Sequence, residues 1–213
     1  AIDHAVLKPE ATEADVRAAA DLCRRRGIGC LCVRPEDIAL AVELLSDGDC
    51  VVGSVVGFPF GIQLTEVKAL EARMALDAGA RELDMVMNAG HFLSGDAAYV
   101  RRDIEAVVAA GHERAAVVKV ILETCRLDER GIRAACRLAE EAGADFVKTS
   151  TGFAGGGATE EAVRIMLESV SPRVGVKASG GIRSWDEAVR FLEMGCRRLG
   201  IGASEQVLDG SGA

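Results

Sequence analysis

Residues 82–88 read Glu-Leu-Asp-Met-Val-Met-Asn, and the alternation of polar and apolar side chains in this stretch decides the fold. Successive side chains of a strand point to opposite faces, so Asp84, Val86 and Asn88 share one face and the other is wholly apolar. When strands close into a barrel, the outer face packs against helices and has to be apolar, so Asp84 is predicted to point inward. Inward polar groups near the carboxyl ends of strands are where barrel enzymes hold their chemistry.

Other short runs of this kind recur along the chain, with stretches of helical periodicity between them. The eight predicted strands are Ile2–Leu7, Gly29–Val33, Val51–Gly57, Glu82–Met87, Val117–Leu122, Asp145–Ser150, Val174–Ala178 and Arg198–Gly202. Start signals predict helices after Thr12 (Glu13–Arg26), Thr65 (Glu66–Ala78) and Thr159 (Glu160–Glu168), and after the capping box Ser184-x-x-Glu187 (Trp185–Met194). Glycines are predicted to end helices at Gly27, Gly79, Gly111, Gly143 and Gly195.

Strands that alternate with helices favour a parallel sheet, which right-handed crossovers can close into a barrel. The competing fold is a doubly wound open sheet, but the loop after Ile2–Leu7 contains no glycine-rich phosphate fingerprint. The sequence therefore predicts an α/β fold, a single-domain TIM (β/α)8 barrel over residues 1–213. Residues 206–213 are expected to form a frayed C-terminal tail.

Composition argues for small-molecule partners. The net charge is −8, the pI is near 5.0 and basic residues are not clustered, so we expect no nucleic-acid partner. Apolar runs such as Val51–Phe60 are too short to span a bilayer and no apolar leader opens the chain, so we expect no membrane association. Seven cysteines without a CxxC pair indicate reduced thiols in a cytoplasmic protein. Only three histidines are present and none is at ligand spacing to another, so no metal and no other cofactor is expected.

Lysines interrupt three of the predicted strands. The chain has only five lysines, and Lys119, Lys148 and Lys177 lie inside apolar runs, where a charge is costly unless it is paired or lies where the barrel opens. Several ammonium groups near one carboxylate in a small cavity favour a neutral amine at one lysine, which can then form an imine. The alternative is a buried ion-pair network that only supports the core. The pattern does not distinguish which lysine is the nucleophile.

Glycine-rich turns follow the last three predicted strands. They contain Gly152, Gly155-Gly156-Gly157, Gly180, Gly181, Gly200 and Gly202. Glycines let backbone N–H groups approach an anion, and barrels commonly bind phosphate at the loops after strands seven and eight. Arg183 lies beside the Gly180-Gly181 pair, so these turns are predicted to bind a phosphorylated small molecule.

Six motifs follow one another at characteristic spacings. They are Ile2-Asp3-His4-x-x-Leu7-Lys8-Pro9, Val55-Val56-Gly57-Phe58-Pro59, Glu82-Leu83-Asp84-Met85-Val86, Lys119-Val120-Ile121-Leu122-Glu123, Phe146-Val147-Lys148-Thr149-Ser150-Thr151-Gly152-Phe153 and Val176-Lys177-Ala178-Ser179-Gly180-Gly181-Ile182-Arg183. From about residue 2 to residue 205 the chain resembles the deoxyribose-phosphate aldolase family. The resemblance implies reversible cleavage of 2-deoxy-D-ribose 5-phosphate to acetaldehyde and D-glyceraldehyde 3-phosphate through a lysine Schiff base.

The same resemblance assigns roles to single residues. It implies that Lys148 is the Schiff-base lysine, that Lys177 is the neighbouring ammonium that lowers its pKa, and that Asp84 works with Lys177 in proton relay. Lys119 matches a supporting lysine that lines the site, and Cys32 matches a cysteine near it, with a core thiol as the alternative. The positions that match the phosphate-binding turn are Gly180, Gly181 and Arg183.

The chain departs from the family pattern on its last predicted strand. Where relatives usually have Gly-Thr-Ser-Ser or Gly-Ala-Ser-Ser, this chain has Gly200-Ile201-Gly202-Ala203, and Ser204 lies one place later. Backbone N–H groups can still bind phosphate there, but the hydroxyl donors are missing. We therefore expect weaker phosphate affinity, or use of unphosphorylated aldehydes.

Two other functions stay open at the level of sequence. One is a phosphosugar isomerase or epimerase that uses Asp84 as a base and forms no imine. The other is a non-catalytic barrel that binds a phosphorylated metabolite and uses its lysines only to neutralise the anion. A homo-oligomer, either a dimer or a tetramer, is also left open by the sequence.

Overall fold

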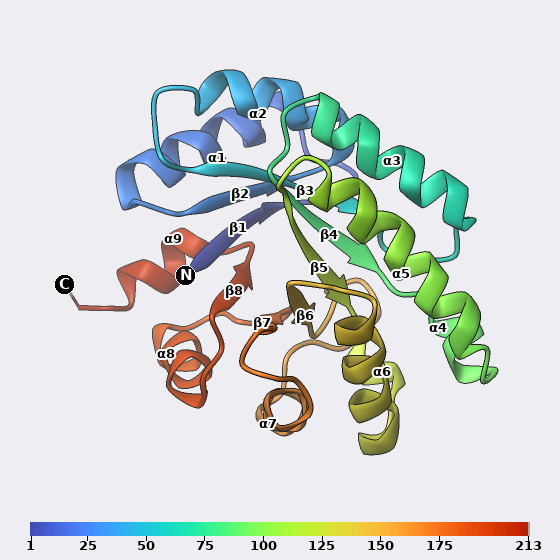
Figure 1. Ribbon diagram of the computed structural model, residues 1–213. Coiled ribbons are helices and arrows are strands. Elements are labelled where there is room, and N and C mark those ends of the chain that lie inside the picture. The colour runs from blue at the N-terminus through green and yellow to red at the C-terminus, as the bar shows by residue number, and fades with distance from the viewer. Residues whose placement is uncertain (213) are drawn as a thin grey trace.

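Eight parallel strands form the centre of the computed structural model, which describes residues 1–212 (Figure 1). They are β1 (Ile2–Val6), β2 (Cys30–Val33), β3 (Val51–Val56), β4 (Glu82–Val86), β5 (Val117–Ile121), β6 (Phe146–Lys148), β7 (Gly175–Ser179) and β8 (Arg198–Ile201). Neighbours in sequence are neighbours in the sheet, and β8 pairs with β1, so the barrel is closed. The predicted barrel is confirmed, the open sheet is wrong, and each predicted run overlaps one strand.

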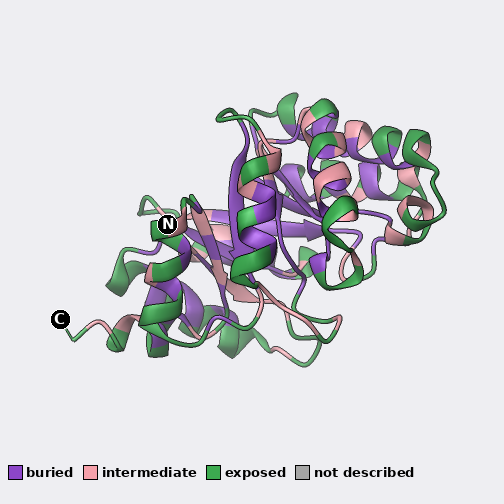
Figure 2. Ribbon diagram, turned by 90° about the horizontal axis from the view of Figure 1, so that it is seen from below, coloured by how far each residue is buried: buried purple, intermediate pink, exposed green. Residues whose placement is uncertain are grey.

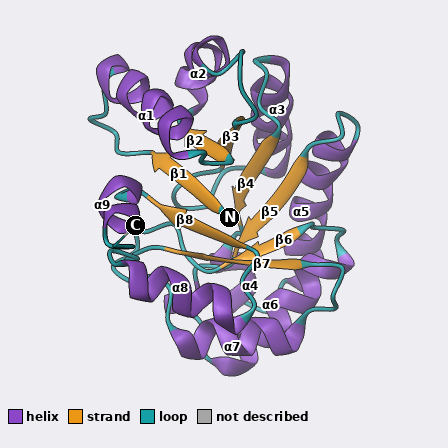
Figure 3. Cartoon of the chain, turned by 90° about the vertical axis from the view of Figure 1, so that its left-hand side faces the viewer, coloured by secondary structure: helices purple, strands orange, loops and turns teal. Residues whose placement is uncertain are grey.

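Helices surround the strands on the outside of the barrel (Figure 3). In the described part of the chain they are α1 (Glu13–Arg26), α2 (Ile38–Leu44), α3 (Thr65–Asp77), α4 (Ala89–Leu93), α5 (Ala97–His112), α6 (Glu129–Glu141), α7 (Glu160–Ser169), α8 (Trp185–Met194) and α9 (Ser204–Asp209), with short 3-10 turns η1 (Pro35–Asp37) and η2 (Thr124–Arg126). None of these helices is long and apolar enough to cross a membrane.

Apolar side chains fill the layer between the strands and the helices. Figure 2 shows that buried residues run along the strands, whereas the helices carry both buried and exposed residues. On β4, Leu83 and Met85 are fully buried in the hydrophobic core, while Asp84 between them meets the side chains of lysines instead. The alternation along residues 82–88 therefore separates a core-packing face from a polar inner face, as predicted.

Three of the four predicted helix starts agree with the structure, because α1, α7 and α8 follow Thr12, Thr159 and Ser184. The fourth start is wrong by one residue: α3 begins at Thr65 itself, and Leu64 is its N-cap. The Thr65 hydroxyl is used elsewhere, since it donates a hydrogen bond to Asp103 on α5 at 3.0 Å.

Four of the five predicted helix-ending glycines lie in left-handed backbone at or just beyond a helix end. Gly111 is the exception, because it lies inside α5, which continues to His112. A Cβ at Gly111 would lie 2.4 Å from the Val118 side chain on β5. This glycine therefore serves the close approach of a helix to a strand rather than a helix end.

Residues 206–209 were expected to lie in a frayed tail, and they lie in α9 instead. Val207 is fully buried, and Arg26 on α1 forms a 2.6 Å salt bridge with Asp209. The segment is thus packed against the barrel through the apolar side chain of Val207. The sequence did not predict this, because α9 has only six residues and so shows little helical periodicity. Ala213 lies outside the described residues.

We predict that Val207→Ala lowers the free energy of unfolding by about 1–3 kcal/mol, because it removes buried methyl groups and leaves a cavity. Gln206→Ala at the exposed neighbouring position is the matched control and should change it little. Equilibrium urea unfolding measures both. If the two variants were equally neutral, the C-terminal segment would be frayed after all.

Candidate active site

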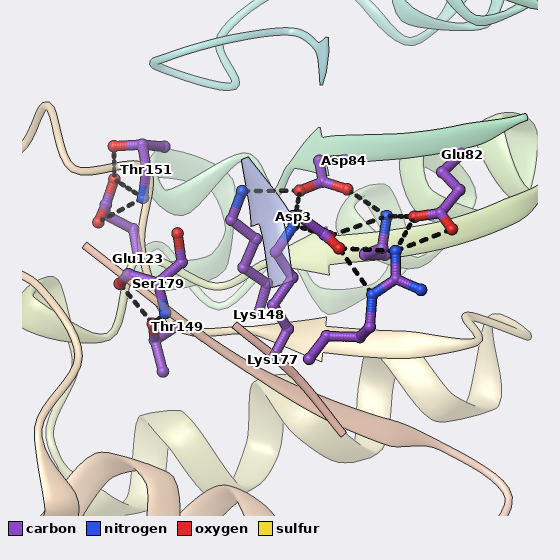
Figure 4. Close-up of polar contacts among 11 residues, drawn as sticks. Asp3, Glu82, Asp84, Glu123, Lys148, Thr149, Thr151, Lys177 and Ser179 are labelled. Atoms are coloured by element: carbon purple, nitrogen blue, oxygen red, sulfur yellow. Dashed lines mark hydrogen bonds and ion pairs between the residues drawn. The ribbon is translucent and has the colours of Figure 1, made fainter. Parts of the chain in front are cut away.

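The carboxylate of Asp84 lies at the centre of a buried polar cluster inside the barrel (Figure 4). Its Oδ2 accepts hydrogen bonds from Lys148 Nζ and Lys177 Nζ, each at 2.7 Å. Its Oδ1 accepts from Lys119 Nζ, also at 2.7 Å. Asp84 is therefore in direct contact with all three lysines that the sequence singled out as catalytic or supporting.

Strand register explains how residues so far apart in sequence meet. Asp84 on β4 is opposite Lys119 on β5, and Lys148 on β6 is opposite Lys177 on β7. Side chains at such positions point to the same face of the sheet, which in a closed barrel is the interior.

A second layer of charged groups was missed at the sequence level. Asp3 accepts from Lys177 at 2.5 Å, and Glu82 lies 2.6 Å from Lys119. Arg198 on β8 bridges Asp3 and Glu82 at 2.6 and 2.7 Å. The signal for Glu82 was available, because it lies two residues before Asp84 and so shares its face.

The charges of this cluster do not balance if every group is ionised. Three carboxylates, those of Asp3, Glu82 and Asp84, face four basic side chains, those of Lys119, Lys148, Lys177 and Arg198. One neutral amine would bring the cluster to zero net charge. Because an uncompensated charge is costly in a buried environment, the surplus favours loss of one proton.

The lysine that gives up this proton is identified by its surroundings. Burial and the neighbouring Lys177 ammonium lower the pKa of Lys148, and only Asp84 among its carboxylate neighbours opposes them. Lys177 is buried to the same degree, but Asp84 and Asp3 together raise its pKa. Burial likewise opposes the charge on Lys119, yet three carboxylates raise its pKa well above its ordinary value. Lys148 is therefore the lysine with the most accessible neutral form.

A cavity of about 190 Å³ lies at the carboxyl ends of the strands, next to this amine. Both Lys148 and Lys177 line it, and so does the thiol-bearing Cys32, whose pKa burial raises to about 11. The predicted glycines that line it are Gly152, Gly180, Gly181, Gly200 and Gly202. Lys119 is not among the lining residues, so it supports Asp84 from within the barrel rather than lining the site as expected.

Bare backbone forms much of the cavity wall at the end of β7 and β8. Gly180 and Gly181 have φ values of 90° and 82°, which side chains rarely tolerate. A Cβ at Gly200 would lie 2.4 Å from Ser179 Oγ and 3.1 Å from Lys177 Cε. Glycine at this position therefore leaves room for the Lys177 side chain.

Arg183 is exposed and lines a larger groove of about 1040 Å³ that shares Gly152, Gly181 and Gly202 with the cavity. The catalytic cavity thus continues into a wider opening that carries one of the predicted phosphate-binding charges. The lysines thus lie at the inner end of this continuous space, and Arg183 lies in its outer part.

One group of three side chains has the separation of metal ligands. Asp3, Cys30 and Glu82 place one ligand atom each within 4.8 Å of one another. Lys119 and Arg198 already bind these carboxylates at 2.6–2.9 Å, so protein cations fill the place that a metal ion would take.

Comparison with known proteins identifies the family of this chain. The model of the DeoC/LacD family aldolases matches residues 1–203. The chain belongs to this family. A deoxyribose-phosphate aldolase from Thermococcus gammatolerans is 51% identical over 212 residues, which are 99% of this chain and 94% of the relative. Another from Streptococcus gordonii is 45% identical and covers 100% of this chain and 96% of the relative.

A solved structure of the family extends the agreement to the fold. The deoxyribose-phosphate aldolase of Aeropyrum pernix superimposes with a TM-score of 0.92 at 36% sequence identity, and the match covers 100% of this chain and 89% of that one. That structure is described as a unique tetramer.

The residues just after β8 carry no hydroxyl at the two positions where the family resemblance led us to expect serines. Gly202 lines the cavity and Ala203 the adjoining groove, in the places of two serines. Ser204 does not replace them, because its fully buried hydroxyl donates to Ile201 O at 3.0 Å and pairs with His4 Nδ1 at 2.9 Å. The basic side chains beside this end of β8 are instead Lys8, which lines both the cavity and the groove, and Arg183, which lines the groove.

Proposed function

We propose that this protein catalyses the reversible cleavage of 2-deoxy-D-ribose 5-phosphate to acetaldehyde and D-glyceraldehyde 3-phosphate through an imine on Lys148. The observation that carries the proposal is the contrast between two lysines on one carboxylate oxygen. Lys148 has a lowered pKa and Lys177 a raised one, and both line the same cavity. The names of the DeoC/LacD relatives, which match the chain over nearly its whole length, support the choice of substrate.

The first stage is imine formation. The neutral Lys148 amine attacks the C1 aldehyde of the open-chain sugar, and the carbinolamine loses water to give a protonated imine. Lys177 is the proton donor for the departing hydroxyl, because its Nζ shares Asp84 Oδ2 with Lys148 at 2.7 Å. Asp84 then stabilises the positive charge that develops on the imine nitrogen, while Lys177, now neutral, stays hydrogen-bonded to Asp3 and ready to accept a proton.

The second stage breaks the C2–C3 bond. The C3 hydroxyl loses its proton to the Asp84–Lys177 pair, and D-glyceraldehyde 3-phosphate leaves as the bonding electrons move into an enamine on Lys148. The same pair returns a proton to C2, and water hydrolyses the resulting imine to acetaldehyde and free Lys148. No redox partner or metal is needed, since every electron pair stays on substrate or lysine.

The phosphate belongs at the glycine turns. We propose that Gly180, Gly181 and Gly200 present backbone N–H groups to it, while Gly152 and Gly202 leave room beside them. Arg183 in the adjoining groove supplies charge without a direct role in the chemistry.

We further propose a homo-oligomeric, cytoplasmic enzyme that acts as one catalytic domain and needs no cofactor. The outer face of α3 supports oligomerisation, because Val67, Leu70 and Met74 are large, apolar and exposed there. All seven cysteines are free thiols, which fits a reducing compartment.

We predict that acetaldehyde followed by borohydride leaves one ethyl group on Lys148, because an imine forms at a neutral amine with room for substrate. Mass spectrometry of the intact protein and peptide mapping measure the adduct. Lys148→Met should abolish it, and Arg102→Met on the exposed face of α5, away from the cavity, should not. An adduct on Lys119 or Lys177 would overturn the assignment, and the absence of any adduct would favour an isomerase or a binding protein.

We predict that Lys177→Leu moves imine formation to higher pH. The ammonium of Lys177 lowers the pKa of Lys148, so its removal raises that pKa, and the neutral amine then becomes available only in more alkaline solution. The rate of borohydride-trapped adduct as a function of pH measures the shift. Arg102→Leu, which removes an exposed charge on α5 away from the cavity, should leave the profile in place. Near wild-type activity of Lys177→Leu at neutral pH would contradict the proposed role.

We predict that the double variant Gly202→Ser, Ala203→Ser lowers KM for deoxyribose 5-phosphate by roughly tenfold, since one hydrogen bond to a charged group contributes about 1.5–3 kcal/mol. Unphosphorylated 2-deoxyribose lacks the acceptor, so its kinetic constants should stay nearly unchanged. Steady-state kinetics on both sugars provide the test. Equal effects on the two sugars, or none, would mean that backbone groups already saturate the phosphate.

A further inference from the structure

Glu123 lies two residues after the end of β5 and has an unusual backbone for its residue type. Its φ and ψ are 56° and 62°, a left-handed conformation that residues other than glycine seldom adopt. Hydrogen bonds on both sides hold it there: Leu122 N–H donates to Lys148 O at 2.9 Å, and Thr124 N–H donates to Thr149 O at 3.0 Å. Such conformations persist only where the surroundings impose them, and they gather at functional sites.

Glu123 is 4% exposed, and its carboxylate accepts hydrogen bonds from neighbouring donors. Thr151 donates to it twice, through its hydroxyl at 2.5 Å and through its N–H at 3.3 and 3.4 Å (Figure 4). The Cys125 thiol lies 3.9 Å away. Among the described residues, no basic side chain forms a salt bridge with this carboxylate. Its charge is therefore directed at Thr151.

Thr151 connects this carboxylate with the catalytic cavity. It lies three residues after Lys148, and both side chains line the cavity. The Thr151 hydroxyl also accepts a hydrogen bond from Phe153 N–H at 3.0 Å. A hydroxyl has one proton and two lone pairs. The proton is committed to Glu123 and one lone pair to Phe153, so only a lone pair is left for a ligand.

We propose that Glu123 is a positioning residue that fixes the polarity of the Thr151 hydroxyl, so that Thr151 accepts a hydrogen bond from a hydroxyl of the three-carbon half of the substrate. This inference rests on the proposed aldolase function. The hydrogen-bond donor has to come from the three-carbon half of the substrate, because that half carries free hydroxyls. The two-carbon half, which leaves as acetaldehyde, carries none after imine formation. Glu123 thus favours a three-carbon aldehyde that carries a hydroxyl group, although it does not contact that aldehyde itself.

Replacement by glutamine gives a sharp test, because the shape stays and the polarity changes. Glutamine has one oxygen and one NH2 group, so it can accept from only one of the two Thr151 donors, the backbone N–H and the hydroxyl. When its NH2 group faces the hydroxyl, the Thr151 oxygen accepts that hydrogen bond and the hydroxyl proton has to point into the cavity. Glu123→Gln should then lower kcat/KM for deoxyribose 5-phosphate by roughly tenfold, the worth of one misdirected hydrogen bond. The trapping rate of acetaldehyde on Lys148 should change less than about twofold, since acetaldehyde offers Thr151 no hydroxyl.

Three companion variants separate positioning from structural support. Thr151→Ser keeps the hydroxyl and should lose much less kcat/KM than Thr151→Val, which removes the hydroxyl and should match the loss in Glu123→Gln. The double variant Glu123→Gln, Thr151→Val should be no slower than Thr151→Val alone, because the carboxylate acts only through that hydroxyl. Thermal unfolding midpoints measured for all four variants report any loss of folded protein.

Three outcomes would overturn the inference: an equal fall in sugar cleavage and acetaldehyde trapping in Glu123→Gln, full activity of Thr151→Val, or additive losses in the double variant. Failure of the aldolase function itself looks different. In that case the wild-type protein would give no acetaldehyde adduct on Lys148 at all.

Discussion

One carboxylate, that of Asp84, accepts hydrogen bonds from three lysine ammonium positions at 2.7 Å each in the interior of the barrel. A buried charge is tolerated only when it is paired, so the barrel has to bring β4, β5, β6 and β7 into the register that makes these contacts. Lys119 is tied to Asp84, Asp3 and Glu82, and Lys177 to Asp84 and Asp3, which raises the pKa of both lysines. Lys148 is paired with Asp84 alone, and because it has fewer carboxylate partners, its neutral and nucleophilic form is easier to reach.

Much of this could be predicted from the sequence. The alternation along residues 82–88 predicted that Asp84 points into the barrel, and the lysines inside apolar strands indicated that part of the interior is polar. Those are local signals, because the face of a strand side chain depends only on its position in the strand. The resemblance to the aldolase family then assigned the nucleophile, which the pattern alone left open among three lysines. The structure brings all of these residues into contact.

The rest depended on contacts between distant parts of the chain. Arg198 bridges Asp3 and Glu82 only because β8 closes against β1. Arg198 and Asp3 are 195 residues apart, so no local sequence pattern could predict their contact. Gly111 was misassigned because a close helix–strand approach and a helix end both require glycine. Glu123 belonged to a recognised motif, but its role appears only when Thr151, 28 residues later, is placed against its carboxylate.

The central claim is that Lys148 is the lysine of this cluster that loses its proton most readily, while Lys177 stays charged beside it. Nuclear magnetic resonance titration of the ligand-free protein with ¹³C-labelled lysine measures this directly, and the five lysines can be assigned by single substitutions. The account predicts that Lys148 titrates below the ordinary lysine value of 10.5 and that Lys177 remains protonated above it. If Lys177 lost its proton before Lys148, or if Lys148 titrated above 10.5, the account would be contradicted.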